Sequence, residues 1–550
     1  MNWQTRKVNK KLSLSLVAAL ILLQSSLLIK SALEDSPVSD EPVHLLSGYL
    51  ILTKGDYSLN PEHPPLAKVL SALAILKNKP SLNLSSEFLK KSKDFYYDNR
   101  REGFSEAENF VYEDNDAKKL FALARLPTII ITLTLTLVAY LILSAVFDEK
   151  IALFSSFFLA LQPNILAHGH LVTTDVWVTL GFLLSAATLY CYANHPNLKW
   201  ALLSGLSVSM ANACKFSALP LWPILIFYFL YFAKKEKLKH LLVGLGVALL
   251  FLWAVYGFKV GFPQGSAGSI PSPRYFAYEL KLLPLPIFSS YLKGAFLVMR
   301  EGIMGRPAYL LGKVLKNGTP FYFPLAWLLK TPLIEILLVF LGIFFAIKKF
   351  QKGDYKKEEA AKFWFFFPYL VFGLFALFSK INIGIRHILP LEVPLLVIAS
   401  FGLTSLTNLF KKKGNLLLVY TLSLFLLGSI KGFPNYIAYF NELVPPEQAK
   451  NLLLDSNLDW GQDLYRLEDY LKSKNLNLEP LYLGYSWHQR ALDYLKINHL
   501  PIENFPGRGI VIINVGMLKR IYYPQTDLSW LNAYQPKDKI GASLYLYEIR

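Results

Sequence analysis

Long apolar segments recur along the first 430 or so residues, separated by short polar stretches. A helix needs about 20 mainly apolar residues to cross a bilayer, or about 17 where it is short. The weakest candidates are 200–213, which is short, and 217–233, because Lys215 stands between the two. The sequence predicts eleven spanning helices: 13–29, 120–147, 151–167, 176–193, 200–213, 217–233, 241–257, 323–347, 363–379, 387–409 and 415–431.

The pattern changes after residue 431. Residues 464–471 follow a helical period, while the runs that begin at Pro480, Gly509 and Ser543 are typical of short strands. The sequence therefore predicts a multispanning α-helical protein with a small α/β domain at its end. The expected division is a membrane domain over 1–431, with long loops at 30–119 and 258–322, and an α/β domain over 432–550.

Composition agrees with a membrane protein. Hydrophobic residues make up 53% of the chain and charged residues only 17%, whereas soluble domains carry about 25% charge. The net charge of +18 would suggest nucleic acid in a soluble protein. With the amino terminus inside, however, the inner segments hold 19 lysines and arginines, whereas the short outer loops hold only Lys215, Lys380 and Arg386. This asymmetry follows the positive-inside rule and removes the main support for a nucleic-acid partner.

An odd number of spans places both long loops and the tail on the outer side. The first apolar segment could instead be a cleaved signal peptide, since a basic start precedes it. A retained first helix is favoured, because an odd span count with a basic interior requires it. We expect an integral membrane protein with its outer regions on the extracytoplasmic side.

Acidic, basic and histidine residues gather at the predicted outer surface. A charge at bilayer depth costs at least about 2.5 kcal/mol, so such residues usually serve a site. The inner loops have no comparable mixture. The residues at this level are Asp40, Glu41, His44, the run 60–68, His168, His170, Asp175, Lys215, Arg386 and His387.

Carboxylates and cations at this level suit a lipid-linked phosphosugar, whose tail stays in the bilayer. Sugar transfer needs a carboxylate to accept the proton of the acceptor. It also needs cations or a metal ion to stabilise the departing phosphate. We predict Asp40 as the base and Asp175 as the second acidic group. The predicted phosphate-binding residues are Lys68, Lys215, Arg386 and His63.

Each of these residues also has a plain structural interpretation. Asp40 and Glu41 could belong to a solvated loop, and Lys215 and Arg386 could simply extend their charges to the interface. His168 and His170 do not share a helix face and have no evident third ligand, which does not favour a metal site. Only the coincidence of all these residues on one side favours a functional site.

Several motifs resemble the GT-C class of polyprenyl-phosphate-dependent glycosyltransferases, and within it family 39, which contains protein O-mannosyltransferases and aminoarabinose transferases. The motifs in the first half are Asp40-Glu41, Gly55-Asp56-Tyr57, Glu62-His-Pro-Pro-Leu-Ala-Lys68 and Thr174-Asp175. Those in the second half, similar to a bacterial subgroup with a tail domain, are Arg306-Pro-Ala-Tyr-Leu-Leu-Gly, Phe321-Tyr-Phe-Pro, Lys330-Thr-Pro and Asn457-Leu-Asp-Trp-Gly-Gln-Asp463.

The resemblance implies a catalytic carboxylate at Asp40, an assisting one at Asp175, inversion at the anomeric carbon, and a sugar donor on undecaprenyl or a related polyprenyl phosphate. It adds Glu41 and Arg306 to the expected substrate-binding positions. Aminoarabinose transferases have a lysine where this chain has His63, so either His63 or Lys68 contacts the donor phosphate. The cofactor stays open, with a divalent cation as one option. The sugar, hexosyl or pentosyl, and the lipid, glycan or protein acceptor also stay open.

Two further regions have alternative interpretations. The basic loop 258–322 either rests on anionic headgroups or closes as a lid over the phosphosugar. The motif 457–463 either binds sugar, stacked on Trp460, or caps and packs the helix that follows, which we favour.

Two other functions compete with glycosyl transfer. A polytopic transporter or lipid-linked sugar flippase would use the same charges along a substrate path, but such proteins often show related halves, and this chain shows no internal repeat. A surface-binding or assembly protein would have its working part in the tail.

Overall fold

A computed structural model describes residues 10–86, 88, 100–260, 288–353, 357–476, 481–520 and 526–550. Each predicted span is helical over most of its length. The helices are α1 (Lys10–Glu34), α6 (Ala117–Ala124), α7 (Leu126–Val146), α8 (Glu149–Leu161), α10 (Asp175–Asn194), α11 (Leu198–Cys214), α12 (Leu221–Phe232), α13 (Lys237–Val255), α16 (Tyr322–Lys330), α17 (Leu333–Gln351), α19 (Phe363–Leu377), α20 (Glu392–Leu409) and α21 (Gly414–Gly432).

Within the described ranges, seven helices are long and apolar enough to cross a membrane, or eight if the bent pair α16 and α17 forms one span. The chain is therefore an integral membrane protein. The count of eleven stays a prediction, because α8, α11 and α12 have only 13, 17 and 12 residues. Large apolar side chains are exposed along the outward faces of α1, α13, α17 and α21, as expected for helices that face lipid.

Small residues let these helices pack closely. A Cβ atom added to Gly205 of α11 would lie 2.1 Å from the carbonyl oxygen of Gly244 on α13. Between apolar helices in lipid, such close backbone contact replaces the hydrophobic driving force available in water. Glycine at this position therefore fixes the spacing between α11 and α13.

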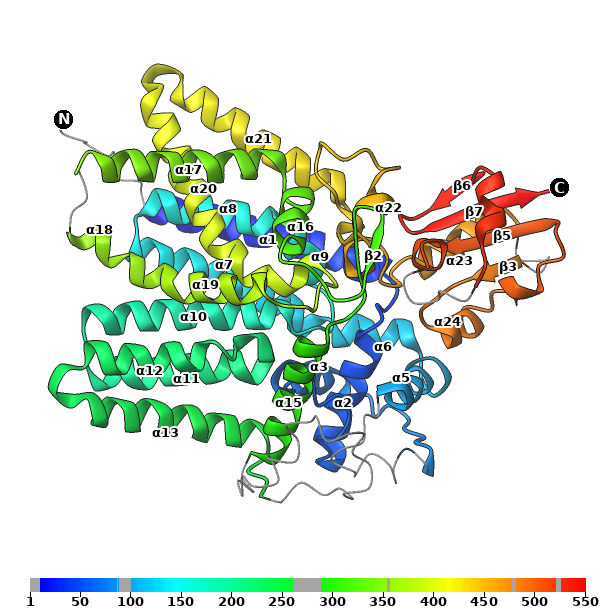
Figure 1. Cartoon of the computed structure of the whole chain (residues 1–550), viewed down its shortest axis with the longest axis horizontal. Helices are drawn as coiled ribbons and strands as arrows, with labels where there is room; N and C mark the ends of the chain where they lie inside the picture. The colour runs from blue at the N-terminus through cyan, green and yellow to red at the C-terminus, as the bar shows by residue number, and fades with distance from the viewer. Residues whose placement is uncertain are drawn as a thin grey trace.

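Shorter elements from the two long loops lie beside the spans at one end of the bundle (Figure 1). The first loop forms α2 (Glu41–Lys54), α3 (Pro65–Leu76) and α5 (Arg100–Glu108). The second forms α15 (Ser289–Met304) and a hairpin of β1 (Ala308–Leu310) and β2 (Lys313–Leu315). Residues 261–287 of this loop lie outside the described residues, so the expected lid or headgroup contact of 258–322 stays a prediction.

The tail contains a five-stranded mixed sheet in the order β4-β3-β5-β7-β6. The predicted strands correspond to β3 (Leu481–Gly484), β5 (Gly509–Asn514) and β7 (Leu544–Ile549), and the predicted helix to α23 (Leu464–Ser473). The edge strands β4 (His499–Pro501) and β6 (Asp538–Ile540) were not predicted, because three residues are too few to show an alternating pattern. Strand β3 pairs in parallel with β4 and β5, whereas β7 pairs antiparallel with β5 and β6.

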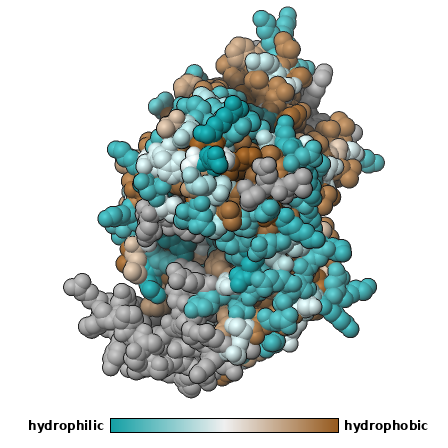
Figure 2. All heavy atoms as spheres, turned by 90° about the vertical axis from the view of Figure 1, so that its right-hand side faces the viewer, coloured by the Kyte–Doolittle hydropathy of each residue, from teal (hydrophilic) through white to brown (hydrophobic). Residues whose placement is uncertain are grey.

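The first loop and the tail share one hydrophobic core. Leu45 and Tyr49 of α2 belong to the same buried cluster as Leu467 of α23 and Leu483 of β3. The predicted domain boundary at residue 431 therefore stays a prediction, since the tail packs on the loop 30–119. Figure 2 views the molecule from the end that carries the tail, and the exposed atoms there are mainly hydrophilic.

Candidate active site

Four charged residues meet where helices end. Asp40 directly precedes α2, Asp175 is the first residue of α10, and Lys215 directly follows α11. Arg386 lies in a 3₁₀ segment, Ile385–Leu391, just before α20. Its Nη1 atom lies 3.1 Å from Asp40 Oδ2 and 3.9 Å from Asp175 Oδ2. One guanidinium therefore bridges both predicted catalytic carboxylates.

The two carboxylates have different surroundings. Asp175 is fully buried, and its Oδ1 atom accepts a hydrogen bond from Lys215. Asp40 keeps 20% of its side chain exposed and has an ion pair with Arg386. A buried charge held between two cations is fixed in place, whereas a partly exposed carboxylate can still accept a proton from an incoming group. The geometry thus fits the different roles predicted for Asp40 and Asp175.

Lys68 and His63 lie next to this cluster. Lys68 Nζ donates to the Asn60 carbonyl over 2.8 Å, and burial lowers its pKa to about 7. A Cβ atom on Gly48 of α2 would lie 2.1 Å from the Lys68 carbonyl oxygen, so close packing of α2 on α3 fixes this lysine. Burial, with nearby His44, Lys215 and Lys68, holds the pKa of His63 well below its usual value. Lys68 and His63, the two residues that could contact the donor phosphate, therefore lie in the same region as the four charged residues.

Histidine nitrogens without partners surround the charges. His44 packs edge-on against His63 with ring centroids 4.7 Å apart, and its buried Nε2 has no partner. Burial lowers the pKa of His44 to about 4 and that of His168 to about 3, so both rings are neutral near pH 7. His63 Nδ1, His168 Nδ1 and His387 Nε2 are likewise buried and unpartnered. Buried polar atoms normally have partners, so these nitrogens are available to a bound polar group such as a sugar hydroxyl.

The cluster does not fit a metal ion. Across the described part of the chain, no group of three or more His, Cys, Asp or Glu residues could hold one. Both carboxylates face cations, and His170 binds Asp35 over 3.0 Å instead of joining His168. We therefore derive no catalytic step from a metal at this cluster.

Glu41 has an environment unlike that of Asp40. Its two oxygens accept hydrogen bonds from Arg125 over 2.9 and 2.6 Å, and also from the backbone N–H groups of Val38 and Val172. Glu41 and Arg125 are both essentially inaccessible. The carboxylate therefore has no evident capacity left for substrate, and this geometry supports a structural role rather than the predicted substrate contact.

Arg306 lies between α15 and β1, beside the cluster rather than within it. Its Nη2 atom is 2.8 Å from Glu301, and 35% of its side chain is exposed. Burial lowers the pKa of Arg306, but Glu301, then Asp40 and Glu62, raise it above the ordinary value. Arg306 thus lies within electrostatic range of Asp40, and its predicted substrate contact stays a prediction.

Sequence reasoning missed that the tail supports Arg386. The guanidinium carbon lies 4.2 Å from the centre of the Trp460 ring, and Nε donates to Ser456 Oγ over 3.1 Å. Trp460 is only 2% exposed, so its ring holds Arg386 and is not free to stack on sugar. No local pattern relates residue 460 to residue 386, although both lie in motifs that the sequence singled out.

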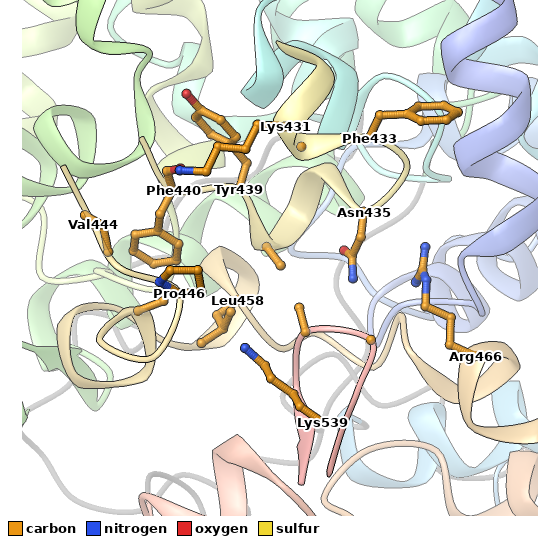
Figure 3. Close-up of a pocket in the computed structure, with 15 residues that line it drawn as sticks. Lys431, Phe433, Asn435, Tyr439, Phe440, Val444, Pro446, Leu458, Arg466 and Lys539 are labelled. Carbon is orange, nitrogen blue, oxygen red and sulfur yellow. The ribbon is translucent and has the colours of Figure 1, made fainter. Parts of the chain in front are cut away.

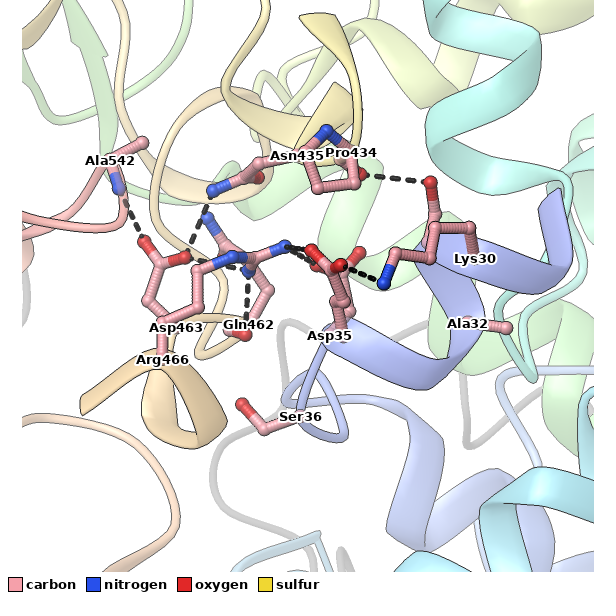
Figure 4. Close-up of polar contacts among 12 residues, drawn as sticks. Lys30, Ala32, Asp35, Ser36, Pro434, Asn435, Gln462, Asp463, Arg466 and Ala542 are labelled. Atoms are coloured by element: carbon pink, nitrogen blue, oxygen red, sulfur yellow. Dashed lines mark hydrogen bonds and ion pairs between the residues drawn. The ribbon is translucent and has the colours of Figure 1, made fainter. Parts of the chain in front are cut away.

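The motif 457–463 packs against neighbouring segments, as we expected, but it does not cap α23. Asp463 makes no side-chain capping bond to α23. Its Oδ2 instead accepts from the backbone of Ala542 and Ser543, while Oδ1 accepts from Asn435 and Arg466. Arg466 also donates to Asp35 over 2.7 Å, which ties the tail to the end of α1 (Figure 4). The expectation of a cap is therefore wrong, because Asp463 joins three segments of the fold.

Replacing Trp460 with leucine tests this support. Cation–π contacts are worth roughly 0.5–2 kcal/mol, so the sugar transfer that the sequence predicts is expected to fall by about 2- to 30-fold, while Trp460→Phe keeps a ring and loses less. Trp530→Leu is a matched control, because Trp530 stacks on Phe505 within the tail. Steady-state turnover is the measurement. Equal losses in Trp460→Leu and Trp530→Leu would contradict a specific effect on Arg386.

A separate cavity of about 300 Å³ lies where α21 meets the tail (Figure 3). Lys431, Asn435, Phe440, Arg466 and Lys539 are among its lining residues. None of the predicted site residues lines it. The cavity therefore belongs to the junction between the bundle and the tail. It is separate from the acid–cation cluster, which consists of Asp40, Asp175, Lys215 and Arg386.

Comparisons with known proteins show what this chain is similar to. The family model for dolichyl-phosphate-mannose-protein mannosyltransferase matches residues 118–257, and no curated protein matches the chain. The apo oligosaccharyltransferase of Archaeoglobus fulgidus is 13% identical, with a TM-score of 0.47 over 96% of this chain and 74% of that one. ArnT from Cupriavidus metallidurans bound to undecaprenyl phosphate is 13% identical, with a TM-score of 0.44 over 96% and 97% of the two chains. The predicted resemblance to glycosyltransferases of the mannosyltransferase type is confirmed over residues 118–257.

Proposed function

We propose that this protein, which resembles GT-C glycosyltransferases, transfers a sugar from a polyprenyl-phosphate carrier to an acceptor hydroxyl or amine. The observation that carries the proposal is the arrangement of Asp40, Asp175 and Arg386, with Lys215 against Asp175. The name of the matching family, which refers to a mannose on dolichyl phosphate, supports a lipid phosphate as the carrier. The cluster lies at helix ends, where a donor with its tail in lipid would place its phosphate.

In the proposed reaction Asp40 accepts the proton of the acceptor as the acceptor oxygen or nitrogen attacks the anomeric carbon. The bond between this carbon and the phosphate oxygen breaks, and the carrier phosphate leaves with the electron pair. Arg386, Lys215 and Lys68 stabilise the charge that develops on the phosphate. Attack opposite the leaving group inverts the anomeric configuration.

We further propose that the reaction takes place on the periplasmic side of a bacterial inner membrane. With the basic loops inside, the ends of the helices that carry Asp40, Asp175 and Arg386 face outward. A polar tail that packs on the first loop suits an aqueous compartment (Figure 2). Lipids, glycans and proteins are all acceptors that this compartment contains.

The test uses purified full-length protein in lipid vesicles with hexosyl and pentosyl polyprenyl-phosphate donors. Release of the free carrier that depends on an added acceptor is the expected result. Movement of intact donor across the vesicle membrane without cleavage would instead support a transporter or flippase. If no donor is cleaved or bound, the proposal fails.

The pH dependence of donor binding tests the role of Lys68. A lysine with a pKa of about 7 is charged below this pH and neutral above it, while the phosphodiester of the donor keeps its charge. The KM for the donor is therefore expected to rise as pH increases from 6 to 8, by up to about tenfold per pH unit above the pKa.

The matched variant is Lys68→Arg, which stays charged throughout this range. Its donor KM is expected to be flat between pH 6 and 8. A wild-type KM that does not change with pH, or the same slope in both proteins, would assign the phosphate contact to another group, with His63 the nearest alternative.

A further inference from the structure

The cavity between α21 and the tail is lined by cations. Lys431 comes from the last turn of α21, Arg466 from α23 and Lys539 from β6. Among the described residues that line the cavity, none is an aspartate or a glutamate. Arg466 already forms ion pairs with Asp35 and Asp463. At about 300 Å³ the cavity has the size of a small ligand site, and its positive charge comes from the two lysines.

These two lysines have no acidic partner. Within the described ranges of the chain, neither Lys431 nor Lys539 belongs to an ion pair. Lys431 Nζ donates to the carbonyls of Phe440 and Asn441 over 3.4 and 3.2 Å, which are long bonds for an ammonium group. Lys539 makes no side-chain hydrogen bond to any described residue, and its amino group points from the sheet into the cavity (Figure 3). Both ammonium groups therefore have donors left for an anion.

A further lysine lies close to Lys539. The Nζ atoms of Lys450 and Lys539 lie 4.4 and 5.7 Å from the centre of the same Tyr545 ring. Burial lowers the pKa of Lys539 and Lys450 lowers it further, while Glu447 and Asp463 offset these effects only in part. Like charges that gather beside a cavity repel each other unless a counter-ion is present. A bound anion would therefore stabilise this corner of the tail.

A lipid-facing stripe of α21 leads directly to the cavity. Leu416, Tyr420 and Leu427 are exposed, and their spacing of four and seven residues places them on one face of the helix. Lys431 follows Leu427 by four residues, so it continues this face and also lines the cavity. A membrane lipid whose chains pack along the stripe would thus have its phosphate beside Lys431. This continuity favours a lipid over a soluble anion.

We propose that the cavity binds the phosphate group of an anionic phospholipid between Lys431 and Lys539. Ammonium groups bind phosphate as point charges, and basic residues at a membrane surface attract anionic headgroups. Lys431 belongs to a membrane helix and Lys539 to the sheet of the tail, so a phosphate bound to both would hold the tail against the bilayer. The tail also supplies Trp460, which supports Arg386. The proposal does not depend on the transferase activity.

The test measures the thermal unfolding midpoint of the full-length protein, freed of lipid in detergent and then titrated with phosphatidylglycerol in mixed micelles. A saturable rise is expected, because a ligand that binds the folded protein stabilises it. Phosphatidylcholine with the same acyl chains has no net charge, and inorganic phosphate has no chains, so each is expected to give a much smaller rise. An equal rise with phosphatidylcholine would mean that only the chains bind, and an equal rise with inorganic phosphate would assign the cavity to a soluble anion. Either result, or no response to phosphatidylglycerol, would overturn the proposal.

Variants locate the effect. Lys431→Gln and Lys539→Gln are each expected to raise the half-saturating concentration of phosphatidylglycerol about tenfold, the usual loss for one hydrogen bond to a charged group. Lys474→Gln is the matched control, because Lys474 is an exposed lysine of the tail that does not line the cavity, and it is expected to change nothing. If both lysine variants saturate as the wild type does, or the control changes as much as they do, the lipid does not bind there. If a variant does not fold, the wild-type titrations with the three ligands still decide.

Discussion

Asp40→Asn is expected to lower the rate of sugar transfer by roughly 10²- to 10⁴-fold, the usual contribution of a general base. Asparagine keeps the size of the side chain and can still lie beside Arg386, but it cannot accept the proton of the acceptor. The carboxylate lies at the entry to α2 with a fifth of its surface exposed, so the exchange should disturb little packing. Turnover of a polyprenyl-phosphate donor and the unfolding midpoint are measured on the same samples.

A matched control is Asp56→Asn, which makes the same chemical change just after α2. Asp56 accepts a hydrogen bond from the backbone N–H of Ser58 and lies outside the acid–cation cluster. Its rate is expected to stay near that of the wild type. If Asp40→Asn retains full activity with a normal unfolding midpoint, Asp40 is not the base.

The sequence could predict the level of the membrane at which the site lies, but not which of its residues touch one another. Asp40, Asp175, Lys215 and Arg386 each lie where an apolar segment begins or ends, and the bilayer places such positions at one level. Which of them touch depends on how the helices pack. That Arg386 bridges Asp40 and Asp175 therefore became visible only in the fold.

Glu41 is a clearer example of a contact that the sequence alone did not predict. It follows Asp40 in sequence, but successive residues of a helix point in directions about 100° apart, and Glu41 points to Arg125. A signal for this pair was present, since Arg125 is a charge inside the predicted span 120–147. Glu335 and Glu392, whose buried carboxyl groups lie side by side, gave the same signal, as charges within predicted spans. If each charge inside a predicted span is taken as one member of a buried pair, the sequence predicts more of the polar contacts inside the fold.

The role of the tail could not be predicted from local patterns. Strands β3, β5 and β7 were visible because each has at least four residues, most of them with apolar side chains. The contact between Trp460 and Arg386 joins residues far apart in sequence and has no periodicity. Removal of the tail from residue 435 onward would thus also remove the support of Arg386, so such a deletion cannot separate donor binding from the function of the tail.

Glu41→Gln is expected to lower the free energy of unfolding by about 3–5 kcal/mol, the usual cost of breaking a buried ion pair. Arg125 would keep its bonds to the carbonyls of Ala32, Asp35 and Ser36, but its charge would have lost the carboxylate that lies 2.6 Å away. Glutamine also cannot accept all the bonds that now reach the two oxygens of Glu41. Denaturant-induced unfolding in mixed micelles measures the change.

The same variant distinguishes a structural role from substrate binding. If Glu41 only supports the fold, the folded fraction of Glu41→Gln binds donor with the wild-type KM. The Glu41→Gln/Arg125→Gln double variant is then expected to be less unstable than the sum of the two single changes, because each single change leaves a buried partner unpaired. An unfolding free energy equal to that of the wild type, together with a raised donor KM, would instead place Glu41 in contact with the donor, as the motif first suggested.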